Sequence, residues 1–244
     1  MKFLAIDCSA VAASVAVTEN GKIISSAYSN VGLTHSQTLM PMLQHTLEQA
    51  HLSLGEIDYF AINAGPGSFT GVRIGVAALK GLTEFSEKNC IPVSTLASLA
   101  YRYKGVAEDL LVCAAMDARC NQVYTATFSV QGEQVTHLTE EEAVLIPDME
   151  ERLKNYKKPL VFVGDGATLC YNYYLEKLNR VSLAPAHLRF QNAESVAALA
   201  EDKIRAGEEP ISSAELLPTY LRAPQAEREL KKKQNQNPET GGIL

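Results

Sequence analysis

A short glycine-rich loop is the part of this sequence whose residue types come closest to a known chemistry. Gly65, Pro66, Gly67 and Ser68 stand between a predicted strand and a predicted helix. At the start of a helix, free backbone N–H groups attract an anion, and glycine lets a phosphate approach the backbone. Ser68 or Thr70 could cap the helix or contact such a phosphate. The loop matches neither G-x-x-x-x-G-K-[ST] nor G-x-G-x-x-G, so the pattern favours a tight strand-to-helix turn over direct phosphate binding.

The sequence contains the same pattern of strand, aspartate and hairpin twice. FLAIDCS is an apolar run with Asp7 near its end, and two β-rich runs joined at Asn20-Gly21 follow it. This dipeptide suits a tight hairpin because both positions tolerate a positive φ. LLVCAAMDAR is a second apolar run, with Asp117 near its end, and the two runs after it turn at Gln131-Gly132. Two ordered matches indicate a duplicated α/β unit.

Predicted helices and strands complete each half. Apolar spacing and capping residues predict helices at His35–Ala50, Thr70–Phe85, Ser94–Tyr103, Leu169–Leu178 and Asn192–Ile204. We expect an N-terminal subdomain over residues 1–105, which carries partner-binding helices, and a C-terminal subdomain over residues 106–225. The last stretch is charged and then polar, and it lacks core residues, which predicts a flexible tail over residues 226–244.

The helices predicted at 35–50 and 70–85 carry more apolar surface than packing on a sheet requires. At about 100° per residue, the apolar and small side chains of the second helix cover an arc of roughly 160°. A helix packed on a sheet needs an apolar stripe of only about 100°. The neighbouring helix of the same chain could cover the surplus, but its own stripe is also wide. The pattern therefore favours an interface with another protein.

The predicted interface draws on both helices. Its residues are His35, Leu39, Met42, Leu43, Thr46, Val72, Gly75, Val76 and Leu79. Small residues such as Gly75 would let a partner helix approach closely. His35 could hydrogen-bond to the partner, or it could only help the first helix to start.

Composition and charge exclude several classes of protein. The 244 residues are 46% hydrophobic and 20% charged, which is typical of a globular chain with a sizeable core. The net charge of −6 gives no basic field, so another protein would have to hold any RNA. Five scattered cysteines without a C-x-x-C pair indicate reduced thiols in a cytoplasmic protein. The first apolar run ends at Asp7 and is too short for a signal peptide or a membrane span.

An ordered set of segments resembles the bacterial TsaB family, also called YeaZ. These segments are LAIDCS, THSQTLMPML, AGPGSFTGVRIGVAALKGL, PVSTLASLA, DARCNQVYTATF and PTYLRAP, and they span residues 1 to about 224. GPGSFTGVRIG is highly specific by itself. The resemblance implies the duplicated α/β fold of acetate and sugar kinases, Hsp70 and actin, with a mixed sheet and flanking helices in each half. This agrees with the repeat found above.

The resemblance also implies a function. The family takes part in placing a threonylcarbamoyl group on the adenosine beside the anticodon of tRNAs that read codons beginning with A. The resemblance implies a non-catalytic subunit that binds the catalytic relative TsaD, and the ATPase TsaE joins this pair. It also implies that the subunit forms homodimers through the helices predicted at 35–50 and 70–85. TsaD carries a metal on a His-x-x-x-His helix. The matching positions here are Thr95 and Leu99, and neither can replace an imidazole, so we expect no metal.

The fold also hosts ATP-using enzymes, so the alternative function is an actin-like kinase or ATPase. Such enzymes need Asp-x-Gly-Thr/Ser so that the backbone can wrap the phosphates. Here the segments are Asp7-Cys8-Ser9 and Asp117-Ala118-Arg119, where side chains obstruct that approach. The two aspartates could instead accept hydrogen bonds from their own hairpins. Arg119 could pair with Asp117 or contact an anion.

Two loops are the candidate positions for an anion or a nucleotide. Gly164-Asp165-Gly166 stands where the fold's adenosine loop lies, although a plain turn is favoured there. The predicted anion-binding residues are Gly65, Gly67, Ser68, Thr70, Gly164 and Gly166. We expect no cofactor except weakly held ATP or ADP at a subunit junction. A metallopeptidase would need zinc or iron, and the other four histidines have no metal-like spacing.

Overall fold

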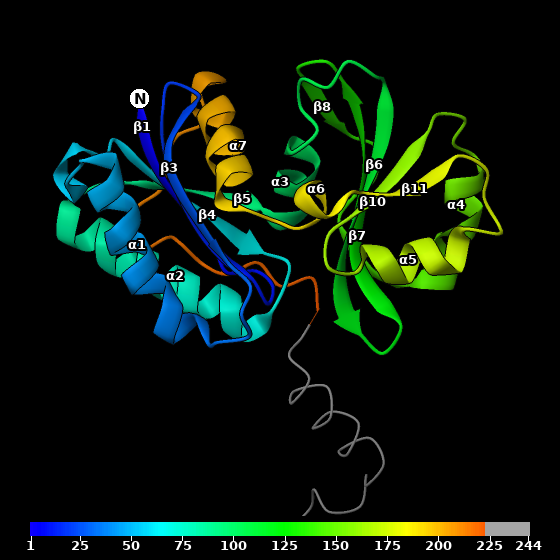
Figure 1. Cartoon of the computed structure of the whole chain (residues 1–244), viewed down its shortest axis with the longest axis horizontal. Coiled ribbons are helices and arrows are strands. Elements are labelled where there is room, and N and C mark those ends of the chain that lie inside the picture. Colours follow the sequence, from blue (N-terminus) through cyan, green and yellow to red (C-terminus); the bar gives the residue numbers. More distant parts are fainter. Residues whose placement is uncertain (223–244) are drawn as a thin grey trace, which may run out of the picture.

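The computed structural model describes residues 1–222, which form two β-sheets side by side with helices on their faces (Figure 1). The first sheet has the strand order β3-β2-β1-β4-β5. Its strands are β1 (Lys2–Asp7), β2 (Ala13–Glu19), β3 (Lys22–Ser29), β4 (Tyr59–Gly65) and β5 (Cys90–Ser94). The first three strands are antiparallel, and β4 and β5 run parallel to β1.

The second sheet repeats this topology. Its order is β8-β7-β6-β10-β11, with β9 pairing with β7 as an addition. The strands are β6 (Leu110–Arg119), β7 (Gln122–Gln131), β8 (Gln134–His137), β9 (Glu142–Leu145), β10 (Leu160–Val163) and β11 (Val181–Leu183). The hairpin strands are again antiparallel, and β10 and β11 again run parallel to the first strand of the unit. The duplicated α/β fold that the repeat predicted is therefore confirmed.

Helices divide the molecule into layers. They are α1 (His35–Ala50), α2 (Phe69–Ser86), α3 (Thr95–Tyr101), α4 (Glu150–Lys154), α5 (Ala167–Tyr174), α6 (Ala186–Arg189) and α7 (Ala193–Arg205). Apolar side chains alternate along β1: Phe3 and Ala5 face one core, while Leu4 and Ile6 face another. The first of these cores is shared by both sheets, with α3 and α7 between them, and the second lies under α1 and α2. A third core packs α4 and α5 on the second sheet.

Local signals in the sequence set several boundaries. Asn192 caps α7, because its Oδ1 accepts the Ser195 N–H at 3.1 Å. The hairpin turn at Asn20-Gly21 has φ values of 50° and 80°, as the dipeptide predicted. Thr34 is the N-cap of α1 but makes no side-chain capping hydrogen bond. Four elements had no clear pattern in the sequence: β9, α4, β11 and α6.

The last described part of the chain returns to the first sheet. Helix α7 packs on β1 and β2, and Ile211 then exchanges two backbone hydrogen bonds with Cys90 at the free edge of β5. Further on, the Thr219 N–H donates to the Ala64 carbonyl at 2.7 Å. We call residues 211–222 the closing segment. The predicted division at residues 105 and 106 stays a prediction, and the predicted tail over 226–244 lies outside the described residues.

The cysteines form no disulfide within the described residues. All five thiols are free, and four of them are buried, whereas Cys120 is exposed in the turn between β6 and β7. Within residues 1–222, none of the helices has the length and apolar character needed to cross a membrane.

Candidate functional site

A cleft of about 420 Å³ lies where the two halves meet. The turns after β1 and β6, the loop before α1, the start of α2, the loop after β10 and the closing segment all contribute to its walls. Its polar and charged lining residues include His35, Ser68, Thr70, Asp117, Arg119, Asp165, Tyr220 and Arg222. The two copies of the repeat thus bring their equivalent turns to one site.

In the first half, Asp7 is sealed within its own turn. Its Oδ1 accepts the backbone N–H of Ser9 at 2.8 Å and the Ser9 hydroxyl at 2.7 Å. Its Oδ2 accepts a hydrogen bond from the side-chain amide of Asn63, which lies in β4, at 2.8 Å. The Asp7 side chain is buried, and this burial raises its pKa although the hydrogen bonds from Ser9 and Asn63 oppose the shift. Both carboxylate oxygens of Asp7 therefore accept hydrogen bonds within the chain, which is the structural role considered for Asp7 in the sequence analysis.

In the second half, the equivalent turn is open to the cleft. The Asp117 Oδ1 accepts the Arg119 N–H at 2.7 Å, which repeats the contact between Asp7 and Ser9. The backbone N–H of Asp117 donates to Asp165 Oδ1 at 2.9 Å, whereas in the first half Asn63 donates to the carboxylate of Asp7 itself. Burial raises the pKa of Asp165 to about 6, and the nearby Asp117 carboxylate adds to this shift. Two carboxylates therefore meet where the first half has one carboxylate and one amide.

Arg119 forms the predicted pair with Asp117. Its Nη1 lies 3.4 Å from Asp117 Oδ2, and its side chain is 79% exposed at the rim of the cleft. An ion pair this exposed contributes little to stability. Ala118 lines the cleft as expected. Cys8 does not obstruct it, because its side chain packs in the core beneath α2.

The glycine loop serves close packing as well as the cleft. A Cβ on Gly67 would lie 2.2 Å from the Ser9 carbonyl oxygen, which accepts the Ser68 N–H at 2.7 Å. Ser68 caps α2 by accepting the Gly71 N–H at 3.2 Å. Gly67, Ser68 and Thr70 line the cleft. Gly65 does not, because Thr219 covers it, with its carbonyl oxygen 2.3 Å from where a Cβ would be.

The glycines after β10 pack against the neighbouring strand. A Cβ on Gly164, which has a φ of 101°, would lie 2.2 Å from the Ala115 carbonyl oxygen. A Cβ on Gly166 would lie 3.0 Å from the Asp117 backbone nitrogen. Neither glycine lines the cleft, whereas Asp165 between them does. The structure thus explains both glycines by packing, as the plain-turn interpretation expected.

The closing segment supplies a wall of the cleft that sequence reasoning missed. The Tyr220 ring lies 5.0 Å from the Phe69 ring, and its hydroxyl accepts the Arg73 Nε–H at 2.8 Å. Arg73 also lies over the Phe69 ring at 3.9 Å. Arg222 reaches the second half, where its Nη1 donates to the Ala118 carbonyl at 3.4 Å. The segment PTYLRAP carries no local pattern that shows its return to α2.

The two positions at which the sequence predicts no metal carry side chains inside the core. Thr95 and Leu99 lie on α3 and are both completely buried. The described residues contain no group of three or more His, Cys, Asp or Glu side chains that could hold a metal ion.

The predicted interface residues do not form a free surface in this chain. Leu39, Leu43, Val72, Val76 and Leu79 are at most 4% exposed and pack on the first sheet. The argument that these side chains exceed what the fold can cover is therefore wrong, because β1, β2 and β4 cover most of the apolar arc.

The remaining predicted interface residues also have partners within the chain. The His35 Nε2 lies 2.7 Å from the Ala10 carbonyl oxygen, so this histidine ties α1 to the turn after β1. The buried Thr46 hydroxyl donates to the Met42 carbonyl, and Met42 is half-buried. Gly75 faces inward, where a Cβ would lie 3.2 Å from Ile62. Its small size serves packing on the chain's own sheet.

A narrower apolar stripe on α2 does face outward. Phe85 is 82% exposed, Ala77 and Gly81 are exposed, and Ile74 and Ala78 are half-buried. Their spacing of three and four residues places them along one side of the helix. We call these five residues the α2 stripe. On the adjacent α1, Met40 is 48% exposed.

Comparison with known proteins places these features in a family. The family model of TsaD, tRNA N6-adenosine threonylcarbamoyltransferase, matches residues 29–230. The tRNA threonylcarbamoyladenosine biosynthesis protein TsaB of Escherichia coli (strain K12) is 38% identical over 170 residues, which cover 68% of this chain and 72% of that protein. The protein of the same name from Bacillus subtilis (strain 168) is 29% identical over 170 residues, covering 69% and 73%. The solved structure of YeaZ from Pseudomonas aeruginosa superposes with a TM-score of 0.75 at 30% identity, covering 90% of this chain and 99% of that one.

Proposed function

Because the chain belongs to the TsaB family, also called YeaZ, we propose that it is a non-catalytic subunit of the machinery that makes threonylcarbamoyladenosine in tRNA. In this proposal it binds the transferase TsaD and supports its activity on the adenosine beside the anticodon. The ATPase TsaE joins the pair, and the chain forms homodimers when alone. The proposed place of action is the cytoplasm, with tRNA held through the complex.

The burial of Thr95 and Leu99 is the observation that carries the non-catalytic assignment. The family model describes a transferase. The two positions that the resemblance assigns to the metal ligands of TsaD carry a hydroxyl and a hydrocarbon within the core. Neither side chain can donate an imidazole nitrogen to a metal. The duplicated fold without this ligand pair supports a role as a partner of the transferase.

The alternative is an ATP-binding kinase or ATPase, which the open second turn favours most. Asp117 and Asp165 face the cleft, and carboxylates of this kind can hold the cation that accompanies phosphates. The first turn counts against it, because both Asp7 oxygens already accept hydrogen bonds from Ser9 and Asn63. A kinase of this fold needs both turns to reach the phosphates.

The α2 stripe is the proposed contact surface for TsaD and for the second copy of the chain. Its small residues Ala77, Ala78 and Gly81 would let a partner helix approach closely, and the exposed Phe85 would provide apolar contact area. This surface replaces the buried set that the sequence suggested. A charge at Val76 would unfold the chain, so it would not test the interface.

The experiment combines the chain with the TsaD and TsaE proteins of its own organism and measures threonylcarbamoyl transfer to tRNA. Transfer should require this chain, and Thr95→Ala should leave it unchanged. Ala77→Glu should prevent coelution with TsaD in gel filtration, whereas Thr168→Glu, on the exposed side of α5, should not. Full transfer without the chain would contradict the proposed role, and an intact complex with Ala77→Glu would contradict the proposed surface.

A calorimetric titration of the isolated chain with ATP and magnesium separates the two candidate functions. The non-catalytic role predicts no turnover and at most weak binding. Micromolar affinity together with hydrolysis would favour the enzyme instead.

A further inference from the structure

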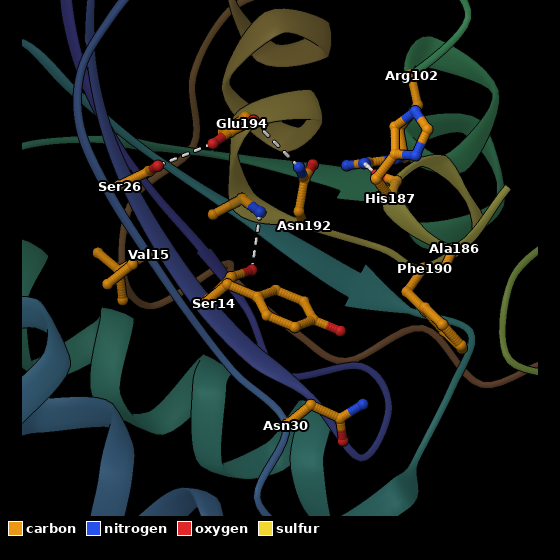
Figure 2. A pocket seen from close by; sticks show the side chains of 13 residues that line it. Ser14, Val15, Ser26, Asn30, Arg102, Ala186, His187, Phe190, Asn192 and Glu194 are labelled. Atoms are coloured by element: carbon orange, nitrogen blue, oxygen red, sulfur yellow. Dashed lines mark hydrogen bonds between the residues drawn. The ribbon is translucent and has the colours of Figure 1, made fainter.

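A second pocket lies away from the cleft and shares no lining residue with it. Its volume is about 480 Å³, within the range of sites that hold small molecules. Figure 2 shows Ser14 and Ser26 on the strands of the first sheet, and Arg102, His187 and Phe190 on the opposite side. Asn192 and Glu194, at the start of α7, lie between these two walls.

Arg102 provides a fixed positive charge in this pocket. Its Nε donates to the Leu188 carbonyl at 3.1 Å, and its Nη2 donates to the His187 carbonyl. No carboxylate oxygen within residues 1–222 lies within 4 Å of the guanidinium, which is half-buried. Burial lowers the pKa of Arg102, and the charge of Glu194 opposes this shift without a direct contact. A desolvated guanidinium held by two carbonyls is prepared for an external anion.

Glu194 provides a fixed negative charge in the same pocket. Its Oε1 accepts the Ser26 hydroxyl at 2.8 Å, and its Oε2 accepts the Asn192 amide at 3.2 Å. Across the described part of the chain, no cationic nitrogen lies within 4 Å of this carboxylate. Each oxygen retains a lone pair for a further donor.

The two charges lie in one pocket, are held separately by neutral groups, and do not pair with each other. A simple anion would satisfy Arg102 and leave Glu194 alone, and a simple cation would do the reverse. We propose that this pocket binds a zwitterionic small molecule of the α-amino acid class, with its carboxylate on Arg102 and its ammonium group on Glu194. Tyr28, Ala186 and Phe190 would surround the side chain of the ligand. The proposal rests on this pocket alone and does not depend on the proposed tRNA-modification role.

The first test uses the full unaltered chain and ligands of graded charge. Isothermal calorimetry with the twenty free L-amino acids should find binders with Kd values of about 1 mM or tighter. The N-acetyl derivative and the methyl ester of the best binder should each bind at least about tenfold more weakly, because each lacks one charge. The proposal is overturned if no amino acid binds, or if either derivative binds as well as the free amino acid.

The second test removes the negative charge of the pocket. Glu194→Gln should weaken binding of the best amino acid at least about tenfold. The variant should still bind the free amino acid more tightly than its methyl ester, because Arg102 is unchanged. Glu151→Gln is the matched control, because this side chain is 94% exposed on α4, remote from the pocket. It should leave the affinity unchanged. Equal affinities of Glu194→Gln and the unaltered chain would overturn the proposal, and the melting temperature of each variant confirms that it is folded.

Discussion

The two halves of this molecule use one turn in two ways. After β1, Asp7 is sealed by Ser9 and Asn63 and does not reach the cleft. After β6, Asp117 makes the same contact two residues ahead, but its neighbour is the carboxylate of Asp165, and both line the cleft. Duplication therefore preserved the backbone geometry of the turn while its surroundings diverged. Similar sequence patterns do not imply similar chemistry, because the strand that lies alongside decides what the aspartate meets.

Replacing Asp7 or Asp117 should have the largest effects on the free energy of unfolding, and the two effects should differ most. Asp7→Ala would leave three buried donors without an acceptor, from Ser9 and Asn63, and should lower the free energy of unfolding by about 4 kcal/mol. Asp117→Ala should lower it by about 1 kcal/mol, because water can replace the partly exposed carboxylate. Urea denaturation of both variants measures the difference. Equal losses would show that the two turns are equivalent after all.

Adding a methyl group to the loop beside each turn should also destabilise the first half more than the second. Gly67→Ala places a Cβ 2.2 Å from the Ser9 carbonyl oxygen, and the backbone must move, at about 3 kcal/mol. Gly166→Ala meets the Asp117 nitrogen at 3.0 Å and should cost about 1 kcal/mol. Gly81→Ala is the control, because nothing lies within 4 Å of its Cβ position on α2, and it should be neutral or stabilising. Thermal unfolding of the three variants ranks them.

The second turn should give the protein a dependence on pH that Asp165→Asn removes. The folded pKa of Asp165 is about 6, above its ordinary value of 3.8, so the native state holds more protons than the unfolded state between these values. The free energy of unfolding therefore falls as pH rises from about 4 to 6, by on the order of 2 kcal/mol from this residue. Urea denaturation at several pH values measures the free energy of unfolding of the unaltered chain and of Asp165→Asn. The difference between the two separates the contribution of Asp165 from that of Asp7. A constant difference across this range would contradict the assignment.

Arg119→Ala should have the smallest effect. The ion pair with Asp117 is 3.4 Å long, and the arginine is largely in solvent, so its loss should cost at most about 0.5 kcal/mol. Added salt should reduce even this difference. A loss above 1 kcal/mol would mean that Arg119 holds the second turn together as Ser9 does in the first.

Local sequence patterns predicted much of the fold but did not reveal the contacts between residues far apart in the sequence. The helix predicted at 35–50 matches α1, Asn192 caps α7, and the repeat gave both sheets. Periodicity gave the width of the apolar arc on α2 but did not reveal what covers it, so Leu79 and Val76 were assigned to a partner when β-strands already bury them.

The candidate site was only half predictable for the same reason. Ser68 and Thr70 were found from glycine-loop chemistry, whereas the pairing of Asp117 with Asp165 joins residues 48 positions apart. One available signal was overlooked. Asn63 lies in β4 and Asp165 follows β10, and each of these strands runs parallel to the first strand of its repeat, so the repeat could have placed both residues near the aspartates.

The return of α7 and of the closing segment to the first sheet has a consequence for synthesis on the ribosome. The edge of β5, the wall beside Phe69 and the core position of Leu216 are all completed by the closing segment, which is translated after every strand of the second sheet. A nascent chain that has emerged only as far as β6 carries every strand of the first sheet and still lacks its final cover. The half that is made first is therefore expected to be the half that is finished last.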